Sequence, residues 1–137
     1  MDAHKDQAIK QKYSAALMSN QKWQKLYKVM AVTGADFAGI EYRFTDTSNI
    51  LFGYAPFESQ IWETAIDDPV TGASGPIEYK HIESMLIPYS YSYQEYENAP
   101  RKTRRLNIKA FIEALEKVGS FPITETEQGI VIHGYKT

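Results

Sequence analysis

The histidines at positions 4, 81 and 133 are the side chains of this sequence best suited to metal binding or acid–base chemistry. On a strand, His81 and Glu83 would point to the same side, because alternate strand residues share one face. A metal ion would need a third ligand, for which His133 is available, but no HExxH motif or paired-histidine spacing is present. We therefore predict no metal site and interpret His81 and Glu83 as a polar strand face. A metal-dependent enzyme centred on these two residues is kept as an alternative.

The sequence offers little support for covalent catalysis. It has no cysteine and no Gly-x-Ser-x-Gly turn that would expose a serine nucleophile. Its eight glycines are dispersed, and the segment TGASGP (residues 71–76) lacks the lysine and the following helix of a phosphate-binding loop. The adjacent carboxylates Asp67 and Asp68 precede Pro69, which is typical of a turn. We predict no catalytic residues and no cofactor, so we do not expect an enzyme.

Tyrosine is concentrated in the segment from Pro88 to Pro100, PYSYSYQEYENAP. Three of its tyrosines alternate with serine, which predicts a strand that carries these rings on one face. Either the rings pack against a helix in the core, or they contribute to an interface, where tyrosine is enriched among the energetically important residues. The acids that follow would suit a basic partner. We predict that a protein partner contacts Tyr89, Tyr91, Tyr93, Glu95, Tyr96 and Glu97.

A basic cluster follows this segment directly and supports nucleic-acid binding as an alternative. Its members are Arg101, Lys102, Arg104 and Arg105. They could supply phosphate contacts next to a tyrosine stacking platform. However, Glu95 and Glu97 lie close by, and the formal net charge of the chain is −2, so nucleic acid is the less favoured partner. Positive charge also opposes the dipole of the helix predicted to follow, so we expect these cations to pair with acids such as Glu95 and Glu97.

Three helices are predicted from apolar residues that recur every three or four positions. The first covers residues 4 to 18. The second follows Ser19-Asn20, which can cap it, and ends at Gly34. Its apolar stripe consists of Trp23, Leu26, Tyr27 and Met30. The third runs from Asn107 to Val118, with Asn107 as its cap and a hydrophobic staple between Leu106 and Phe111. Its core stripe consists of Ile108, Phe111, Ile112, Leu115 and Val118.

Strands are predicted where apolar and polar residues alternate, most clearly from Ile40 to Phe44. A turn at residues 46–49 and a loop from Asp67 to Pro76 separate the later strands. The predicted strands are residues 40–44, 50–54, 61–66 and 77–87, the last with a bulge near Lys80 and His81, and a hairpin between Ile123 and Tyr135. The predicted fold class is therefore α+β: N-terminal helices, a mainly antiparallel sheet of about four to six strands, one later amphipathic helix and a C-terminal hairpin.

The 137 residues fit one domain of ordinary size, with residues 1–20 interpreted as a frayed helical extension. The lack of cysteine is consistent with a reducing compartment, and the first residues have no apolar segment of a signal peptide. No apolar run approaches the roughly 20 residues that span a bilayer. We therefore expect a cytoplasmic protein without a membrane partner.

Three short motifs resemble a family of small uncharacterised bacterial α+β proteins. They are KWQKL (Lys22 to Leu26), GPIEYKHIE (Gly75 to Glu83) and IVIHGY (Ile130 to Tyr135). The resemblance covers most of the chain from Lys22 onward, although Ser84 stands where the family often carries tryptophan. It implies a bacterial origin and a compact domain, and it carries no catalytic residues over to this chain.

A small, slightly acidic α+β domain without catalytic apparatus is also similar to the immunity proteins of bacterial toxin–immunity systems. Such proteins bind one toxin domain tightly and block it. On this analogy we expect a non-catalytic protein-binding module whose partner is a cognate toxin domain, for example a basic nuclease.

Overall fold

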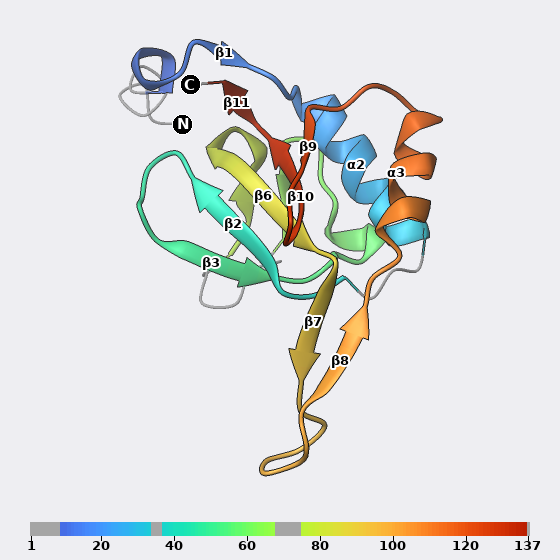
Figure 1. Cartoon of the computed structure of the whole chain (residues 1–137). Helices are drawn as coiled ribbons and strands as arrows, with labels where there is room; N and C mark the ends of the chain where they lie inside the picture. The colour runs from blue at the N-terminus through green and yellow to red at the C-terminus, as the bar shows by residue number, and fades with distance from the viewer. Residues whose placement is uncertain (1–8, 34–36, 68–74, 137) are drawn as a thin grey trace.

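The computed structural model describes residues 9–33, 37–67 and 75–136. Its centre is an antiparallel sheet of five strands in the order β3-β2-β6-β10-β9. These strands are β2 (Ile40–Phe44), β3 (Ile50–Gly53), β6 (Ile82–Pro88), β9 (Ile123–Glu125) and β10 (Gly129–His133). Helices α2 (Asn20–Val32) and α3 (Ile108–Glu116) pack on one face of this sheet (Figure 1). The predicted α+β class, including the C-terminal hairpin of β9 and β10, is confirmed.

Both helices begin at the predicted capping residues. The Ser19 hydroxyl accepts a hydrogen bond from the backbone N–H of Lys22 at 3.1 Å, and the Asn107 side chain accepts one from Ala110 at 3.2 Å. The stripe predicted for α2 is buried as expected. In α3, Ile108, Phe111 and Leu115 are buried and Ile112 is half-buried. Val118 was wrongly placed in this stripe: it lies beyond the end of α3 and is 43% exposed. The predicted end of α2 at Gly34 lies outside the described residues.

The first predicted helix is present only at residues 9–12 of the described chain, and an extended segment follows it. Of the predicted residues 4–18, residues 4–8 lie outside the described part. Strand β1 (Ala15–Ala16) then pairs with β11 (Tyr135–Lys136). The backbone N–H of Ser14 donates to the Lys136 carbonyl at 2.8 Å, and that of Leu17 donates to the Gly134 carbonyl at 2.9 Å. Hydrogen bonds to the far end of the chain therefore take the place of the next helical turn.

The predicted strand at residues 61–66 was wrong over most of its length. Only β4 (Ala65–Ile66) is a strand, and it pairs with β5 (Ile77–Glu78). Ile61 forms an isolated bridge with Ile66, so the segment folds back on itself. Before it lies the short 3₁₀ helix η1 (Glu58–Gln60). The predicted loop from Asp67 to Pro76 lies mostly outside the described residues.

Residues 77–87 form two strands rather than one. A 3₁₀ turn, η2 (Tyr79–His81), separates β5 from β6. Within this turn Tyr79 is buried, and its hydroxyl donates to the Trp62 carbonyl at 2.7 Å. The predicted bulge near Lys80 and His81 is therefore a turn. The register between β2 and β6 shifts just after it, opposite Glu83.

One hydrophobic core lies between the helices and the sheet. The rings of Trp23, Tyr27 and Tyr79 stack with centroids 5.9 to 6.5 Å apart. Phe37 and Phe111 meet edge to face at 5.1 Å and connect α3 to the start of β2. No helix of the described residues is long and apolar enough to cross a membrane.

Strands β7 (Ser90–Tyr93) and β8 (Lys102–Arg105) form a separate two-stranded hairpin. This hairpin projects away from the sheet and the helices (Figure 1). The strand predicted from the alternating tyrosines is present as β7, which begins two residues after β6 ends at Pro88. The basic cluster, in contrast, is its partner strand, which the sequence pattern did not reveal.

Candidate binding site

The pairing of β7 with β8 gives the projecting hairpin two different faces. Tyr91 lies opposite Arg104 and Tyr93 lies opposite Lys102, and directly opposed residues of an antiparallel pair share one face. The two tyrosine rings contact each other with centroids 5.9 Å apart. The other face carries Ser90 and Ser92 opposite Arg105 and Thr103. The structure therefore brings the predicted aromatic residues and part of the basic cluster onto one surface, which we call the aromatic–basic face.

A groove of about 520 Å³ separates this face from the body of the protein. Tyr91, Tyr93 and Arg104 line it on the hairpin side. The body contributes apolar residues from the end of α2, from the segment before β2 and from the segment after β3, namely Met30, Ala31, Phe37, Ala38, Tyr54, Ala55, Pro56 and Phe57. The groove thus combines an apolar lining with a single cationic side chain.

Two groove residues, Tyr54 and Phe57, did not figure among the predicted partner contacts. They are 59% and 77% exposed, which is unusual for large aromatic side chains. Both flank Ala55-Pro56, and the proline cannot continue the ladder of the preceding strand. The sequence feature that could have indicated these contacts is a pair of aromatic residues beside a proline at the end of a predicted strand. Only the fold shows that they face a hairpin that begins more than thirty residues later.

The base of the hairpin is fixed to the body by Tyr89. Its backbone N–H donates to the Gln128 carbonyl at 3.0 Å, and its carbonyl accepts from the N–H of Leu106 at 2.7 Å. Its half-buried side chain packs against the core. Close by, Gly39 has a positive φ of 68°, and a Cβ at this position would lie 3.5 Å from that of Tyr91. Of the three alternating tyrosines, Tyr89 therefore belongs to the core margin, whereas Tyr91 and Tyr93 face the groove.

The tip of the hairpin, residues 94–100, is a hydrogen-bonded loop. The side chain of Gln94 donates to the Ala99 carbonyl at 2.9 Å, and the N–H of Ala99 donates to the Tyr96 carbonyl at 3.0 Å. Asn98 adopts a positive φ of 64°, which asparagine tolerates well. Tyr96 is left 67% exposed at the end of the hairpin.

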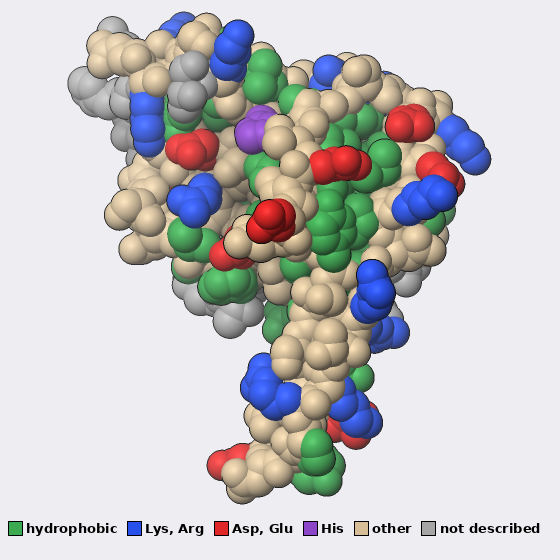
Figure 2. Space-filling view, viewed as in Figure 1, with side chains coloured by type: hydrophobic (Ala, Val, Ile, Leu, Met, Phe, Trp, Pro, Cys, Tyr) green, Lys and Arg blue, Asp and Glu red, His purple; other side chains and the backbone are tan. Residues whose placement is uncertain are grey.

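Charge changes sign along the hairpin, as the acidic and basic side chains in Figure 2 show. The exposed acids Glu95 and Glu97 lie at the tip, while every residue of β8 is exposed and three of its four residues are basic. The Lys102 ammonium pairs with Glu95 at 2.6 Å, so the predicted pairing of the cluster with nearby acids is found for this lysine. The Arg101 guanidinium instead donates to the Ser92 hydroxyl at 2.9 Å.

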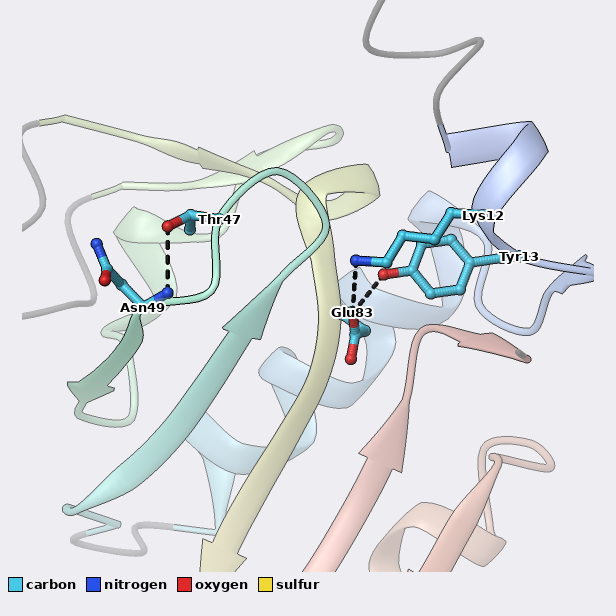
Figure 3. Close-up of polar contacts among 5 residues, drawn as sticks. All are labelled: Lys12, Tyr13, Thr47, Asn49 and Glu83. Carbon is cyan, nitrogen blue, oxygen red and sulfur yellow. Dashed lines mark hydrogen bonds and ion pairs between the residues drawn. The ribbon is translucent and has the colours of Figure 1, made fainter.

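The metal-site candidates occupy a different part of the molecule. The Glu83 carboxylate accepts a hydrogen bond from the Tyr13 hydroxyl and lies 3.6 Å from the Lys12 ammonium (Figure 3). His133 shares a hydrogen bond of 2.9 Å with the Thr124 hydroxyl. Within residues 9–33, 37–67 and 75–136, no three histidine, aspartate or glutamate side chains gather as a metal-binding group. His81, Glu83 and His133 are thus not brought together in the way the alternative requires.

Burial and, secondarily, the hydrogen bond to Glu83 raise the pKa of Tyr13 well above its ordinary value. Tyr13 therefore stays protonated and donates to the carboxylate, and its ring stacks on Tyr135 with centroids 4.8 Å apart. This set of contacts fastens the start of the described chain to β6 and β11.

The sequence matches no protein-family model, and comparisons with curated proteins and with solved structures gave no match.

Proposed function

We propose that this chain is a non-catalytic protein-binding module, most concretely an immunity protein that neutralises a bacterial toxin by direct binding. The observation that carries the proposal is the projecting hairpin, whose aromatic–basic face lines an open apolar groove. Exposed aromatic residues next to arginine are the composition typical of the energetic centre of a protein interface. Tyr91, Tyr93 and Phe57 would supply contact area, and Tyr96 would extend the contact to the tip.

The charges refine the kind of partner expected. Glu95 is already paired with Lys102, so it has less to offer a basic partner than the sequence suggested. Glu97 and Tyr96 at the tip still suit a basic or apolar surface, while Arg104 in the groove suits an acidic group. A toxin segment that occupies the groove should therefore carry an apolar side chain next to a carboxylate.

Capture from a lysate of the source bacterium tests this proposal, with the product of the neighbouring gene expressed. The wild-type chain should retain one specific protein, and Tyr91→Ala/Tyr93→Ala should lose it. The matched control, Ser90→Ala/Thr103→Ala, changes the opposite face of the same hairpin and should retain it. Expression of the captured protein alone should inhibit growth, and co-expression of this chain should restore it. The absence of any stable partner would refute the proposal.

A second candidate, nucleic-acid binding, is favoured by one observation: β8 is fully exposed and carries three cations on a two-stranded ribbon, an element of a size that fits the major groove of DNA. Filter binding at low salt tests it. Replacement of Arg101, Lys102, Arg104 and Arg105 by alanine should then abolish binding and flatten its salt dependence. Affinity that is absent, or unchanged in this variant, rules the candidate out.

A further inference from the structure

We propose that two copies of this chain form a two-fold symmetric dimer in which the hairpin tip of each copy occupies the groove of the other. The first argument is charge. Each hairpin has acids at its tip and basic residues along β8, and Glu97 makes no ion pair with another described residue. Two such hairpins placed antiparallel bring each acidic tip next to the basic strand of the other. A two-fold interface must be self-complementary in this way.

The second argument is the fit between tip and groove. The tip presents Tyr96, an exposed aromatic ring, which is flanked in the sequence by Glu95 and Glu97. The groove, of about 520 Å³, presents aromatic walls and the Arg104 guanidinium. The tip therefore carries the apolar side chain with a neighbouring carboxylate that the groove is suited to bind. Burial of a tyrosine ring removes a large apolar area from water, which favours association.

The third argument is position along the hairpin. Tyr91 and Tyr93 line the groove from within β7, and Tyr96 follows three residues beyond Tyr93 in the loop at the tip. In an antiparallel pair, Tyr96 of one copy then lies beside Tyr91 and Arg104 of the second copy when the symmetry axis passes next to Tyr93. Both tips reach a groove at the same time, so the arrangement closes as a dimer and leaves no groove open.

This inference does not rest on the proposed toxin partner. The dimer uses the same tyrosines as that partner, so a toxin would bind the monomer and compete with self-association. A nucleic acid is the less favoured occupant of this surface, because the acidic tip would repel phosphate groups.

Sedimentation velocity of the purified full chain, from low micromolar to submillimolar concentration, measures the dimer directly. We expect a concentration-dependent dimer that Tyr96→Ala weakens by about tenfold or more. Phe52→Ala, which removes a 52% exposed ring from the edge strand β3, is the matched control and should leave dimerisation unchanged. Circular dichroism melting curves of all variants should coincide with that of the wild type, since neither side chain is buried.

A charge exchange identifies the contact. Glu97→Lys and Arg104→Glu should each weaken the homodimer, because each creates like charges at both contacts. An equimolar mixture of the two variants should restore a heterodimer, in which both contacts again pair opposite charges. A wild-type chain that stays monomeric, or a dimer indifferent to Tyr96→Ala and to the charge exchange, overturns the proposal. A monomer whose capture of a different protein is lost in Tyr96→Ala would assign the tip to that protein.

Discussion

Two tyrosine hydroxyl groups form a hydrogen bond inside the core. The hydroxyls of Tyr27 and Tyr42 lie 2.8 Å apart, and that of Tyr27 also contacts the Met85 sulfur at 3.6 Å. Both side chains are fully buried, so neither hydroxyl can exchange its partner for water. The bond between them joins α2 to β2, because one hydroxyl comes from each element.

Removal of one of these two hydroxyls should lower the free energy of unfolding by more than the net contribution of one hydrogen bond, because the other hydroxyl stays buried without its oxygen partner. In Tyr42→Phe the Tyr27 hydroxyl loses its oxygen partner in a dry site, and we expect the free energy of unfolding to fall by about 1–3 kcal/mol. The double variant Tyr27→Phe/Tyr42→Phe should lose less than the sum of the single variants, as denaturant titrations can measure. Tyr54→Phe, at an exposed ring, should be neutral. Strict additivity would show that the two hydroxyls do not depend on each other.

Alkaline pH should unfold this protein through its buried tyrosines. Burial raises the pKa of Tyr79 from its ordinary value of about 10 to about 12, and burial also raises the pKa values of Tyr27 and Tyr42. Well below pH 10 these tyrosines stay protonated in both the folded and the unfolded state, so their contribution to the free energy of unfolding is fully retained. Between pH 10 and 12 the unfolded chain loses a proton that the folded Tyr79 keeps, and stability falls by up to about 1.4 kcal/mol per pH unit for each such group.

Urea titrations between about pH 8 and 12 measure this loss. Tyr79→Phe should start from a lower stability at neutral pH, because it lacks the bond to the Trp62 carbonyl, but it should show a weaker dependence on alkaline pH. Equal slopes for the wild type and Tyr79→Phe would mean that Tyr79 ionises normally in the folded state.

At the scale of elements, Phe111 is one of three side chains that bury α3 in the core, with Ile108 and Leu115. The Phe111 side chain is 1% exposed and meets Phe37 edge to face. Phe111→Ala should lower the free energy of unfolding by about 3–5 kcal/mol, because it leaves a cavity beneath the helix. Val118→Ala, just past the end of α3, should change it by less than about 0.5 kcal/mol. A small effect of Phe111→Ala in thermal or urea unfolding would contradict the placement of α3 in the core.

The elements that the sequence predicted well are those with local signals. Helices α2 and α3 have an apolar stripe and a capping residue within their own residues, and β2 has a clean alternation. Strands β1 and β8 were missed because their pairing partner decides their conformation. Ala15–Ala16 pairs with β11, which is distant in the sequence, and the charged strand β8 has no apolar alternation that would predict it.

The residues of the candidate site were also predicted only in part. The tyrosines, the acids and the basic cluster were each singled out from residue type and spacing, but as rival hypotheses with separate partners. Pairing of β7 with β8 places them on one hairpin. Tyr54 and Phe57 could not be assigned to a binding site from the sequence, because the groove that they line forms between segments that are distant in the sequence. The exposure of a side chain depends on the tertiary structure, so local sequence patterns predict it poorly.

At the scale of the whole molecule, the hairpin tip should be dispensable for folding. Replacement of residues 94–101 by Asn-Gly would join Tyr93 to Lys102 through a two-residue turn, which suits an antiparallel pair. We expect unfolding free energy to change by about 1 kcal/mol or less, because a shorter loop also closes at lower entropic cost. Dimerisation and partner capture should be lost, as sedimentation and lysate capture can establish. Global unfolding of this variant would show that the tip belongs to the folding unit.

The pairing of β1 with β11 places the first and the last described strands side by side, at the pole opposite the hairpin (Figure 1). A carrier, a fluorophore or a solid support attached through this pole would leave the hairpin pointing away from the attachment point. Immobilisation through the β1–β11 pole would therefore leave the hairpin at the opposite pole accessible. Sensor surfaces and fusions prepared in this way should report binding at the hairpin without steric interference.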